Sequence, residues 1–512
     1  MFIKQPIRIV LGAIVLLCGR TAFADTNSQA LLRRPWFEAR TPHFSMYSCA
    51  PTQEVARVGA RLEQFREAYS SLAGAQSVAS PPIVVMVFPD HKSLEPFLPV
   101  YQGKPSNLAA FFHRGSDENL IVLYAGVAGA GSLENVFHEY THLLLRHNAL
   151  YWPLWLNEGM ADIYSTFEPL PDRVVRIGKP MDQYLRLLAR RPLMPLSDLL
   201  RVNHQSPEYN ERDRQGIFYA ESWLLTHYLM LGDNPATRAR FGQLTGFLKQ
   251  GQSPEQAFTN TFRVTLTQME NQLRRYLERG HFESQKMTVN TDLTAPRAFS
   301  TRTLPPVAVC FRLGNLLMRI NRLESATEYF ELGKKIAPKS PLPYEGLGLL
   351  ASERKQADEA VRQLEQARKL GSTSFLAHYA FAREKYRLTS KSPDTYTPVS
   401  KEIAAEIRSE LEKSLQLMPD FGPARHMLGF FLMVQGDNLA EAEKQLQQAI
   451  QLEPENQGYL FSLAQAQFRR DNPTAALRTL EPLRLSYVDA QLRQHAEEMI
   501  KEIGRETGRA KP

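Results

Sequence analysis

Cysteines, acidic residues near the N-terminus and long apolar runs are all scarce in this 512-residue chain. The three cysteines allow at most one disulfide. No Asp or Glu precedes Asp25, and the apolar run from Ile9 to Cys18 is too short for a comfortable membrane span. The chain has neither an acidic nor a basic tail. Its formal charge of +7 becomes +4 without the three basic residues before Asp25, so a nucleic-acid partner is not expected.

Residues 1–24 have the pattern of a secretory signal peptide. They combine a basic start, an apolar centre and a small-x-small cleavage site, at Lys4 and Arg8, Ile9 to Cys18, and Ala22 to Ala24. We therefore expect an exported protein, periplasmic in a Gram-negative bacterium or secreted. A membrane attachment would require an uncleaved segment or lipidation of Cys18, and the bulky Leu17 disfavours lipidation.

Cys49 and Cys310 would remain after cleavage. We assign them to different domains, so a disulfide between them would join the two domains covalently. Two buried thiols are the alternative, and the sequence leaves the choice open.

The C-terminal part repeats with a period of 34 residues, marked by small residues at Gly314, Gly348 and Ala382. Such residues let the two helices of a repeat approach closely. This period resembles that of the tetratricopeptide repeat. We predict about five repeats over residues 307–490, with an insertion near 388–402, and a capping helix and tail over residues 491–512. The resemblance implies a protein or peptide partner on the repeats.

The first 300 residues mix strand and helix patterns. We expect strands followed by helices, an α+β domain over residues 25–287, and then a linker over residues 288–306. The expected strands are Phe44 to Ser48, Pro82 to Phe88 and Asn119 to Tyr124, and the first long helix is Thr52 to Leu72.

His138-Glu139-Tyr140-Thr141-His142 is an H-E-x-x-H motif. Apolar residues at helical spacing predict a helix from Ser132, a plausible N-cap, to His147. On a helix, both imidazoles lie on one face, one turn apart, and reach one Zn²⁺. Glu139 lies about 100° round the helix, where it accepts a proton from a metal-bound water without being a ligand.

A catalytic zinc needs a third protein ligand. A metzincin would place Gly at position 145 and His at position 148, whereas this chain has Leu145 and Asn148, so that class is excluded. A second helix opened by Pro153 would point Glu158 at the metal. Asp162, one turn further on, would accept the free ring N–H of His138 or of His142.

The H-E-x-x-H motif followed by N-E-G-x-A-D resembles the gluzincins, the thermolysin-like zinc peptidases. More narrowly, it resembles the peptidase MA-like domains of bacterial exported proteins, over residues 34–277. The gap before Glu158 is shorter than in thermolysin, so the connecting loop must be tight. The resemblance implies a zincin-like α+β metallopeptidase fold and one Zn²⁺. It assigns His138, His142 and Glu158 as ligands, Glu139 as general base and Asp162 as the residue that orients a ligand.

Gluzincins stabilise the oxyanion with a Tyr or His from a later helix. Tyr219 is the candidate here, with a core tyrosine as the alternative, and His227 is the reserve. His204 has no partner at ligand spacing, so we expect a surface or core residue. We expect the strand Asn119 to Tyr124 to lie along the cleft as an edge strand and to pair with an extended peptide.

These features predict an exported zinc metallopeptidase, a hydrolase whose repeats recruit its protein substrate or a partner. An endopeptidase is favoured, because Gly126 to Gly131 carries no carboxylate to anchor a substrate amine. The alternative is a non-enzymatic repeat scaffold with a degenerate or purely structural zincin domain. The presence of Glu139 argues against that alternative, since zinc binding alone does not require it.

Overall fold

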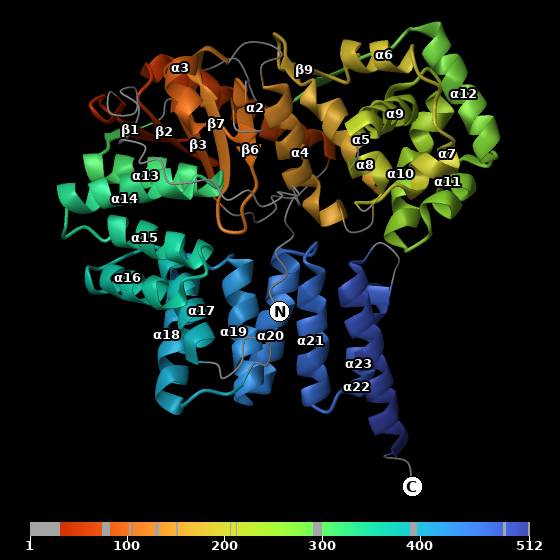
Figure 1. Ribbon diagram of the computed structural model, residues 1–512. Helices are drawn as coiled ribbons and strands as arrows, with labels where there is room; N and C mark the ends of the chain where they lie inside the picture. The colour runs from red at the N-terminus through yellow and green to blue at the C-terminus, as the bar shows by residue number, and fades with distance from the viewer. Residues whose placement is uncertain are drawn as a thin grey trace. The chain divides into compact units, whose positions relative to one another are not determined.

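The computed structural model divides into two compact units (Figure 1). One contains residues 38–94 and 108–302, and the other contains residues 1–37, 95–107 and 303–512. The expected signal peptide and the expected N-cap Ser132 lie outside the described residues. The structure describes residues 31–73, 82–101, 104–106, 108–127, 133–149, 152–204, 206–210, 212–289, 300–389, 397–484 and 488–509.

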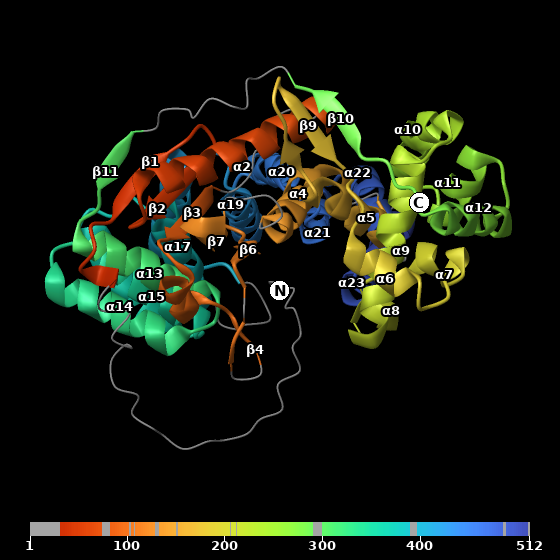
Figure 2. The same ribbon diagram turned by 90° about the horizontal axis from the view of Figure 1, so that it is seen from above.

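A mixed sheet forms the first half of the 38–302 unit (Figure 2). Among the described residues it has six strands in the order β11-β1-β2-β3-β7-β6. The three central strands are parallel, and β6 pairs antiparallel with β7. Their bounds are β1 Phe37–Arg40, β2 Phe44–Ser48, β3 Ile83–Phe88, β6 Ala110–His113, β7 Asn119–Tyr124 and β11 Thr301–Thr303.

The predicted strands appear at the expected residues, but the predicted edge strand is wrong. β7 lies between β3 and β6, so its backbone groups are already paired on both sides. Its first five residues are buried, which explains the continuous apolar run. Among the described strands, β6 is therefore the edge next to β7.

Helices make up most of the rest of this unit. α2 (Thr52–Ala73) follows β2, as the amphipathic pattern predicted. α4 (Glu134–Ala149) packs on α5 (Leu154–Ser165), and α5 packs on α9 (Arg212–Leu231). The others are α3 His91–Leu94, α6 Asp182–Leu188, α7 Leu196–Arg201, α8 Pro207–Asn210, α10 Pro235–Lys249, α11 Pro254–Phe262 and α12 Leu266–Arg279, with a small sheet of β8 Glu168–Pro169, β9 Val174–Ile177 and β10 Gln285–Thr288.

Gly159 permits the close approach of α5 and α9. A Cβ at this position would lie 2.0 Å from Thr226 Oγ1 and 2.4 Å from the backbone oxygen of Ser222. Both distances are far below van der Waals contact, so only glycine fits here. This packing gives a physical reason for the glycine of the N-E-G sequence, and it fixes the position of the neighbouring Glu158.

The second unit is a row of antiparallel helix pairs (Figure 1). The predicted small residues lie where the helices of a pair meet: a Cβ on Gly314 would collide with Phe330, and one on Gly348 with Leu364. The predicted helical repeat solenoid is confirmed. Its helices are α13 Pro306–Arg319, α14 Leu323–Ile336, α15 Leu342–Glu353, α16 Ala357–Lys369, α17 Phe375–Thr389, α18 Lys401–Leu417, α19 Gly422–Gln435, α20 Leu439–Leu452, α21 Gln457–Arg469, α22 Pro473–Leu480 and the terminal α23 Ala490–Arg509.

A segment from the first third of the sequence belongs to this helical unit. Residues 95–107 carry the short strands β4 (Val100–Tyr101) and β5 (Lys104–Pro105). Phe97 is buried, with its ring centroid 6.1 Å from that of Tyr329 on α14, and Arg322 donates to the Pro96 carbonyl. The domain boundaries predicted from the sequence placed residues 95–107 in the α+β domain. They did not predict this contact, because it joins residues more than 200 positions apart.

Two further observations complete the fold. No helix among the described residues is long and apolar enough to cross a membrane. Cys49 and Cys310 are both free thiols, and they belong to different units, so the structure contains no disulfide between them.

Candidate metal centre

Three predicted ligands converge between α4 and α5. The Nε2 atoms of His138 and His142 lie 3.2 Å apart, and Glu158 Oε2 lies 3.3 Å from each of them. The two histidines are one turn apart on α4, and Glu158 comes from the first half of α5. The packing of α4 on α5 thus brings Glu158 next to the two histidines, although it lies 16 residues after His142 in the sequence.

This triangle fits a tetrahedral metal ion. With ligand bonds of about 2.0–2.1 Å, a tetrahedral zinc site spaces its donor atoms about 3.3 Å apart. Glu158 is buried, and its Oε2 has no hydrogen-bond partner among the described residues. A buried carboxylate oxygen in that position is costly unless a cation satisfies it. Two imidazoles and one carboxylate are also one of the donor sets found in catalytic zinc sites.

Burial and the neighbouring charges together shift the pKa values of the cluster. Burial alone would raise the pKa of Glu158, but the two adjacent imidazoles outweigh burial and lower that pKa to about 2. Burial would lower the pKa of His138, whereas Asp162 and Glu158 raise it to about 10. Glu158 is therefore ionised at neutral pH, as a ligand must be. A bound metal would displace the proton of His138, since coordination requires the neutral imidazole.

Asp162 selects the orientation of one histidine. Its Oδ1 accepts a hydrogen bond from His138 Nδ1 at 2.9 Å, which leaves Nε2 turned toward Glu158. The sequence had left both histidines open as partners. Burial raises the pKa of Asp162, and the hydrogen bond from His138 opposes that shift. Tyr184 on α6 also interacts with Asp162, whose negative charge adds to burial in raising the pKa of the Tyr184 phenol.

Glu139 is exposed on α4, beside but outside the three-residue cluster. It shares an electrostatic neighbour with the cluster: Tyr209 on α8. Burial raises the pKa of the Tyr209 phenol to about 12, with contributions from the charges of Glu158 and Glu139. An exposed carboxylate next to the ligands is accessible to solvent and to a substrate, as the general-base prediction requires.

The reserve candidate for the oxyanion donor is wrong. His227 is fully buried; its Nδ1 accepts from the Tyr276 hydroxyl at 2.8 Å, and its Nε2 donates to the Gly178 carbonyl at 3.0 Å. Both ring nitrogens are therefore occupied in the core. The ring of Tyr219 packs against Tyr209, with centroids 6.2 Å apart, and its role stays a prediction.

Three side chains near the cluster, those of Tyr184, His204 and Tyr209, were given no role there by the sequence. His204 is exposed, and its ring lies 5.3 Å from that of Tyr209. Burial of its surroundings lowers the pKa of His204, and the charges of Glu158 and His142 also act on it. The short helices α6 to α8 carry no motif or strong period, so only folding reveals that Tyr184, His204 and Tyr209 surround the cluster.

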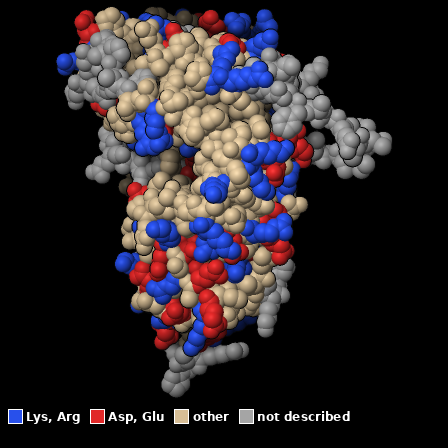
Figure 3. All heavy atoms as spheres, turned by 90° about the vertical axis from the view of Figure 1, so that its left-hand side faces the viewer, with Lys and Arg blue, Asp and Glu red and all other residues tan. Residues whose placement is uncertain are grey.

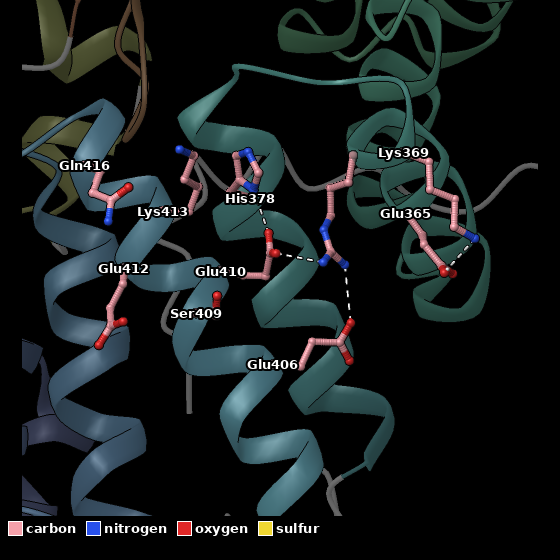
Figure 4. A pocket seen from close by; sticks show the side chains of 10 residues that line it. Glu365, Lys369, His378, Glu406, Ser409, Glu410, Glu412, Lys413 and Gln416 are labelled. Atoms are coloured by element: carbon pink, nitrogen blue, oxygen red, sulfur yellow. Dashed lines mark hydrogen bonds and ion pairs between the residues drawn. The ribbon is translucent and has the colours of Figure 1, made fainter.

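A hollow of about 560 Å³ lies in the helical unit among α16, α17 and α18 (Figure 4). Its floor is an ion network in which Glu410 accepts from His378 Nδ1 at 2.6 Å and from Arg368 at 2.7 Å. Arg368 also meets Glu406, and Lys369 pairs with Glu365. The two pairs of Arg368 join α16 to α18 in the next repeat, and the side chains of the network satisfy one another, which suits a structural role.

The comparisons with known proteins find tetratricopeptide repeat proteins. The tetratricopeptide repeat family model matches residues 307–340, which span α13 and α14. Among solved structures, the chain is similar to YrrB, described as a TPR protein with an unusual peptide-binding site (20% identity, 37% of this chain and 90% of that one, TM-score 0.31). It is also similar to TTC0263 of Thermus thermophilus (18% identity, 38% of this chain and 99% of that one, TM-score 0.29). A third similar structure is a tetratricopeptide repeat protein of Parabacteroides merdae (14% identity, 54% of this chain and 90% of that one, TM-score 0.29).

No curated protein matched the sequence. The family match at the first repeat and the paired packing of the helices define the class of the C-terminal unit, a tetratricopeptide-type solenoid.

Proposed function

We propose that this chain is an exported zinc-dependent hydrolase that cleaves peptide bonds and recruits a protein or peptide through its helical repeats. The observation that carries the proposal is the triangle of His138, His142 and Glu158, with Asp162 bonded behind His138. A set of three ligands, a residue that orients one of them, and an adjacent exposed carboxylate occur together on two packed helices, and this combination supports a zinc hydrolase.

Each side chain has a role in hydrolysis. His138, His142 and Glu158 would hold the zinc, which when bound acidifies water and polarises a carbonyl group. Glu139 accepts a proton on its carboxylate from the attacking water and returns it to the leaving amine. Asp162 holds the proton of His138 on Nδ1, so that Nε2 stays free to coordinate. Tyr219 remains the candidate donor to the oxyanion.

The edge strand β6 is suited to bind an extended substrate. It precedes β7 and packs next to α4, with the ring of Phe112 stacked 6.4 Å from that of Tyr140 within the H-E-x-x-H motif. A peptide added along β6 would form main-chain hydrogen bonds irrespective of its side chains. This assignment replaces the expected role of β7.

A second candidate function is binding without catalysis. The family match supports a protein-interaction role for the repeats, and the comparisons contain nothing on hydrolysis. In this alternative, the 38–302 unit would be a structural relic. The exposed Glu139 favours the enzyme, because zinc binding alone does not require that carboxylate.

The deciding experiment compares wild type with Glu139→Gln for zinc content and for cleavage of casein and a fluorogenic peptide library. We expect both proteins to bind zinc, and the variant to lose activity by about 10²–10⁴-fold. Glu278→Gln, which removes an exposed carboxylate from α12, is the matched control and should keep full activity. Bound zinc with no turnover in any of the three proteins would favour the scaffold.

A further inference from the structure

One buried histidine joins three elements of the 38–302 unit. His227 on α9 is 0% exposed. Its Nε2 lies 3.0 Å from the carbonyl oxygen of Gly178, which follows β9, and its Nδ1 lies 2.8 Å from the hydroxyl of Tyr276 on α12. A carbonyl oxygen can only accept, so Nε2 carries the proton and Nδ1 accepts from Tyr276. These two bonds therefore require the neutral imidazole in a single tautomer.

The surroundings of His227 oppose the addition of a second proton. Its ring packs against the rings of Trp223 and Phe282, with centroids 5.2 and 5.7 Å away. Protonation would turn Nδ1 into a donor that faces the hydroxyl of Tyr276. That hydroxyl has no other acceptor among the described residues, so reversing the bond would leave its proton unpaired in the core. A buried polar group without a partner is costly, and an unpaired buried charge costs more still.

No charged side chain in the described part of the chain acts on His227 to offset this cost. Burial lowers the pKa of His227 to about 4, and its bond to the backbone carbonyl opposes the shift only in part. Elsewhere opposite charges lie beside one another at the surface, as the lower part of Figure 3 shows for the helical unit. The titratable groups of this region act on Tyr276 instead, and α5 and β9 contribute none of them: Tyr228, Asp233, Arg279 and Glu283.

The backbone of Gly178 connects this histidine to the helix that carries a metal ligand. The Gly178 amide donates to the carbonyl oxygen of Ile163 on α5 at 3.1 Å and to Thr166 Oγ1 at 2.8 Å. Ile163 directly follows Asp162, whose carboxylate accepts from the zinc-ligand candidate His138. Gly178 thus bonds on one side to α9 and on the other to the end of α5. Loss of the histidine's bond would therefore loosen α9 from the part of α5 next to the metal centre.

We propose that His227 is an acid-sensitive latch, whose protonation releases α9 from Gly178 and α12 and thereby weakens the zinc site. Its pKa in the fold lies below the ordinary value of about 6.5, so the unfolded chain takes up the proton first. The stability that the neutral ring contributes is therefore complete above about pH 6.5 and is lost as the pH falls toward 4. The effect on zinc rests on the proposed function, whereas the latch itself does not.

The first test follows the protonation of His227 in the full wild-type chain. Deuterium exchange at the imidazole C2 carbon depends on protonation and is read for each histidine by mass spectrometry of peptides. We expect exchange at His227 to be slower than at His281, which is 72% exposed, and to change at a lower pH by at least about one unit. Equal rates with the same pH dependence at the two histidines would overturn the proposal.

The second test removes the proton acceptor. His227→Gln retains a donor for Gly178 and an acceptor for Tyr276, but it cannot be protonated. Backbone hydrogen exchange of the zinc-free full chain is measured at pH 5 and pH 7.5 in the peptides that cover β9 and α12. After correction for the intrinsic rates, exchange in wild type should be at least about tenfold faster at pH 5 than at pH 7.5, and in His227→Gln it should hardly change.

His281→Gln is the matched control and should respond to pH as wild type does, because its side chain is exposed. The same pH response in wild type and in His227→Gln would overturn the latch. In zinc-loaded chains, His227→Gln should retain the metal to a lower pH than wild type, and loss at the same pH would overturn the coupling. Zinc at pH 7.5 separates the two proposals: a wild-type chain that binds none there refutes the metal centre, while the exchange data still decide on the latch.

Discussion

Replacing Gly159 with alanine tests whether the packing of α5 on α9 positions the metal ligand. The added Cβ would lie 2.0 Å from Thr226 Oγ1 and 2.4 Å from the Ser222 carbonyl oxygen. Ordinary carbon contacts lie near about 3.5 Å, so α5 must retreat by about 1 Å or more. Overpacking of this kind costs about 1–3 kcal/mol, and the better helix propensity of alanine returns about 1 kcal/mol.

We therefore expect Gly159→Ala to lower the free energy of unfolding by up to about 2 kcal/mol, measured by urea denaturation followed by circular dichroism. Glu158 should move with α5, and zinc affinity, measured by competition with a chelating dye, should fall at least about tenfold, since ligand distances tolerate only about 0.2 Å. Adding Thr226→Ala should restore part of the stability, because it removes the hydroxyl but not the backbone clash.

Gly242→Ala is the matched control, because this glycine also lies inside a helix but no atom lies within 4 Å of the added Cβ. It should raise stability by up to about 1 kcal/mol and leave zinc affinity unchanged. If Gly159→Ala unfolded at the wild-type urea midpoint and bound zinc equally well, the packing argument would be refuted.

Three further predictions concern single side chains. Asp162→Asn should weaken zinc binding about 10–100-fold in the same dye assay, and unchanged affinity would show that the bond to His138 is dispensable. Burial raises the pKa of Glu221 to about 8, above its value in the unfolded chain. The neutral carboxyl is therefore favoured in the fold, and the stability that it contributes is complete in acid and is lost as the pH rises toward 8. The stability gained by Glu221→Gln should therefore grow from pH 5 to pH 8 in urea titrations, and a constant difference would contradict this. Burial also raises the pKa of the Cys310 thiol to about 11, so iodoacetamide at pH 8 should modify it only after unfolding, as mass spectrometry can show.

The sequence predicted those parts of the fold that depend on local patterns. The buried run at Ile83 to Phe88 and the spacing of Gly314 and Gly348 each reflect one element or one helix pair, and the structure has both. The order of strands in the sheet depends on non-local pairing. For this reason the edge role was assigned to β7, although β6 lies outside it.

In the candidate site too, the residues on regular helices could be predicted from the sequence, and those that surround them could not. His138, His142, Glu158 and Asp162 lie on two regular helices, so helical spacing sufficed to place them on common faces. The surroundings of the cluster come from the irregular region around α6 to α8, where sequence spacing does not determine position. His227 has helical spacing from Tyr219, but its bonds to Gly178 and Tyr276 depend on tertiary packing.

The zinc content of the purified full chain is the most direct test of the central claim. Each protein is loaded with zinc, freed of unbound metal and analysed by inductively coupled plasma mass spectrometry. We expect about one zinc per chain in wild type and in Glu139→Gln, and almost none in His142→Ala. Folding of each variant is checked by circular dichroism. A wild-type chain that retains no zinc, or a His142→Ala chain that retains as much as wild type, would contradict the proposed metal centre.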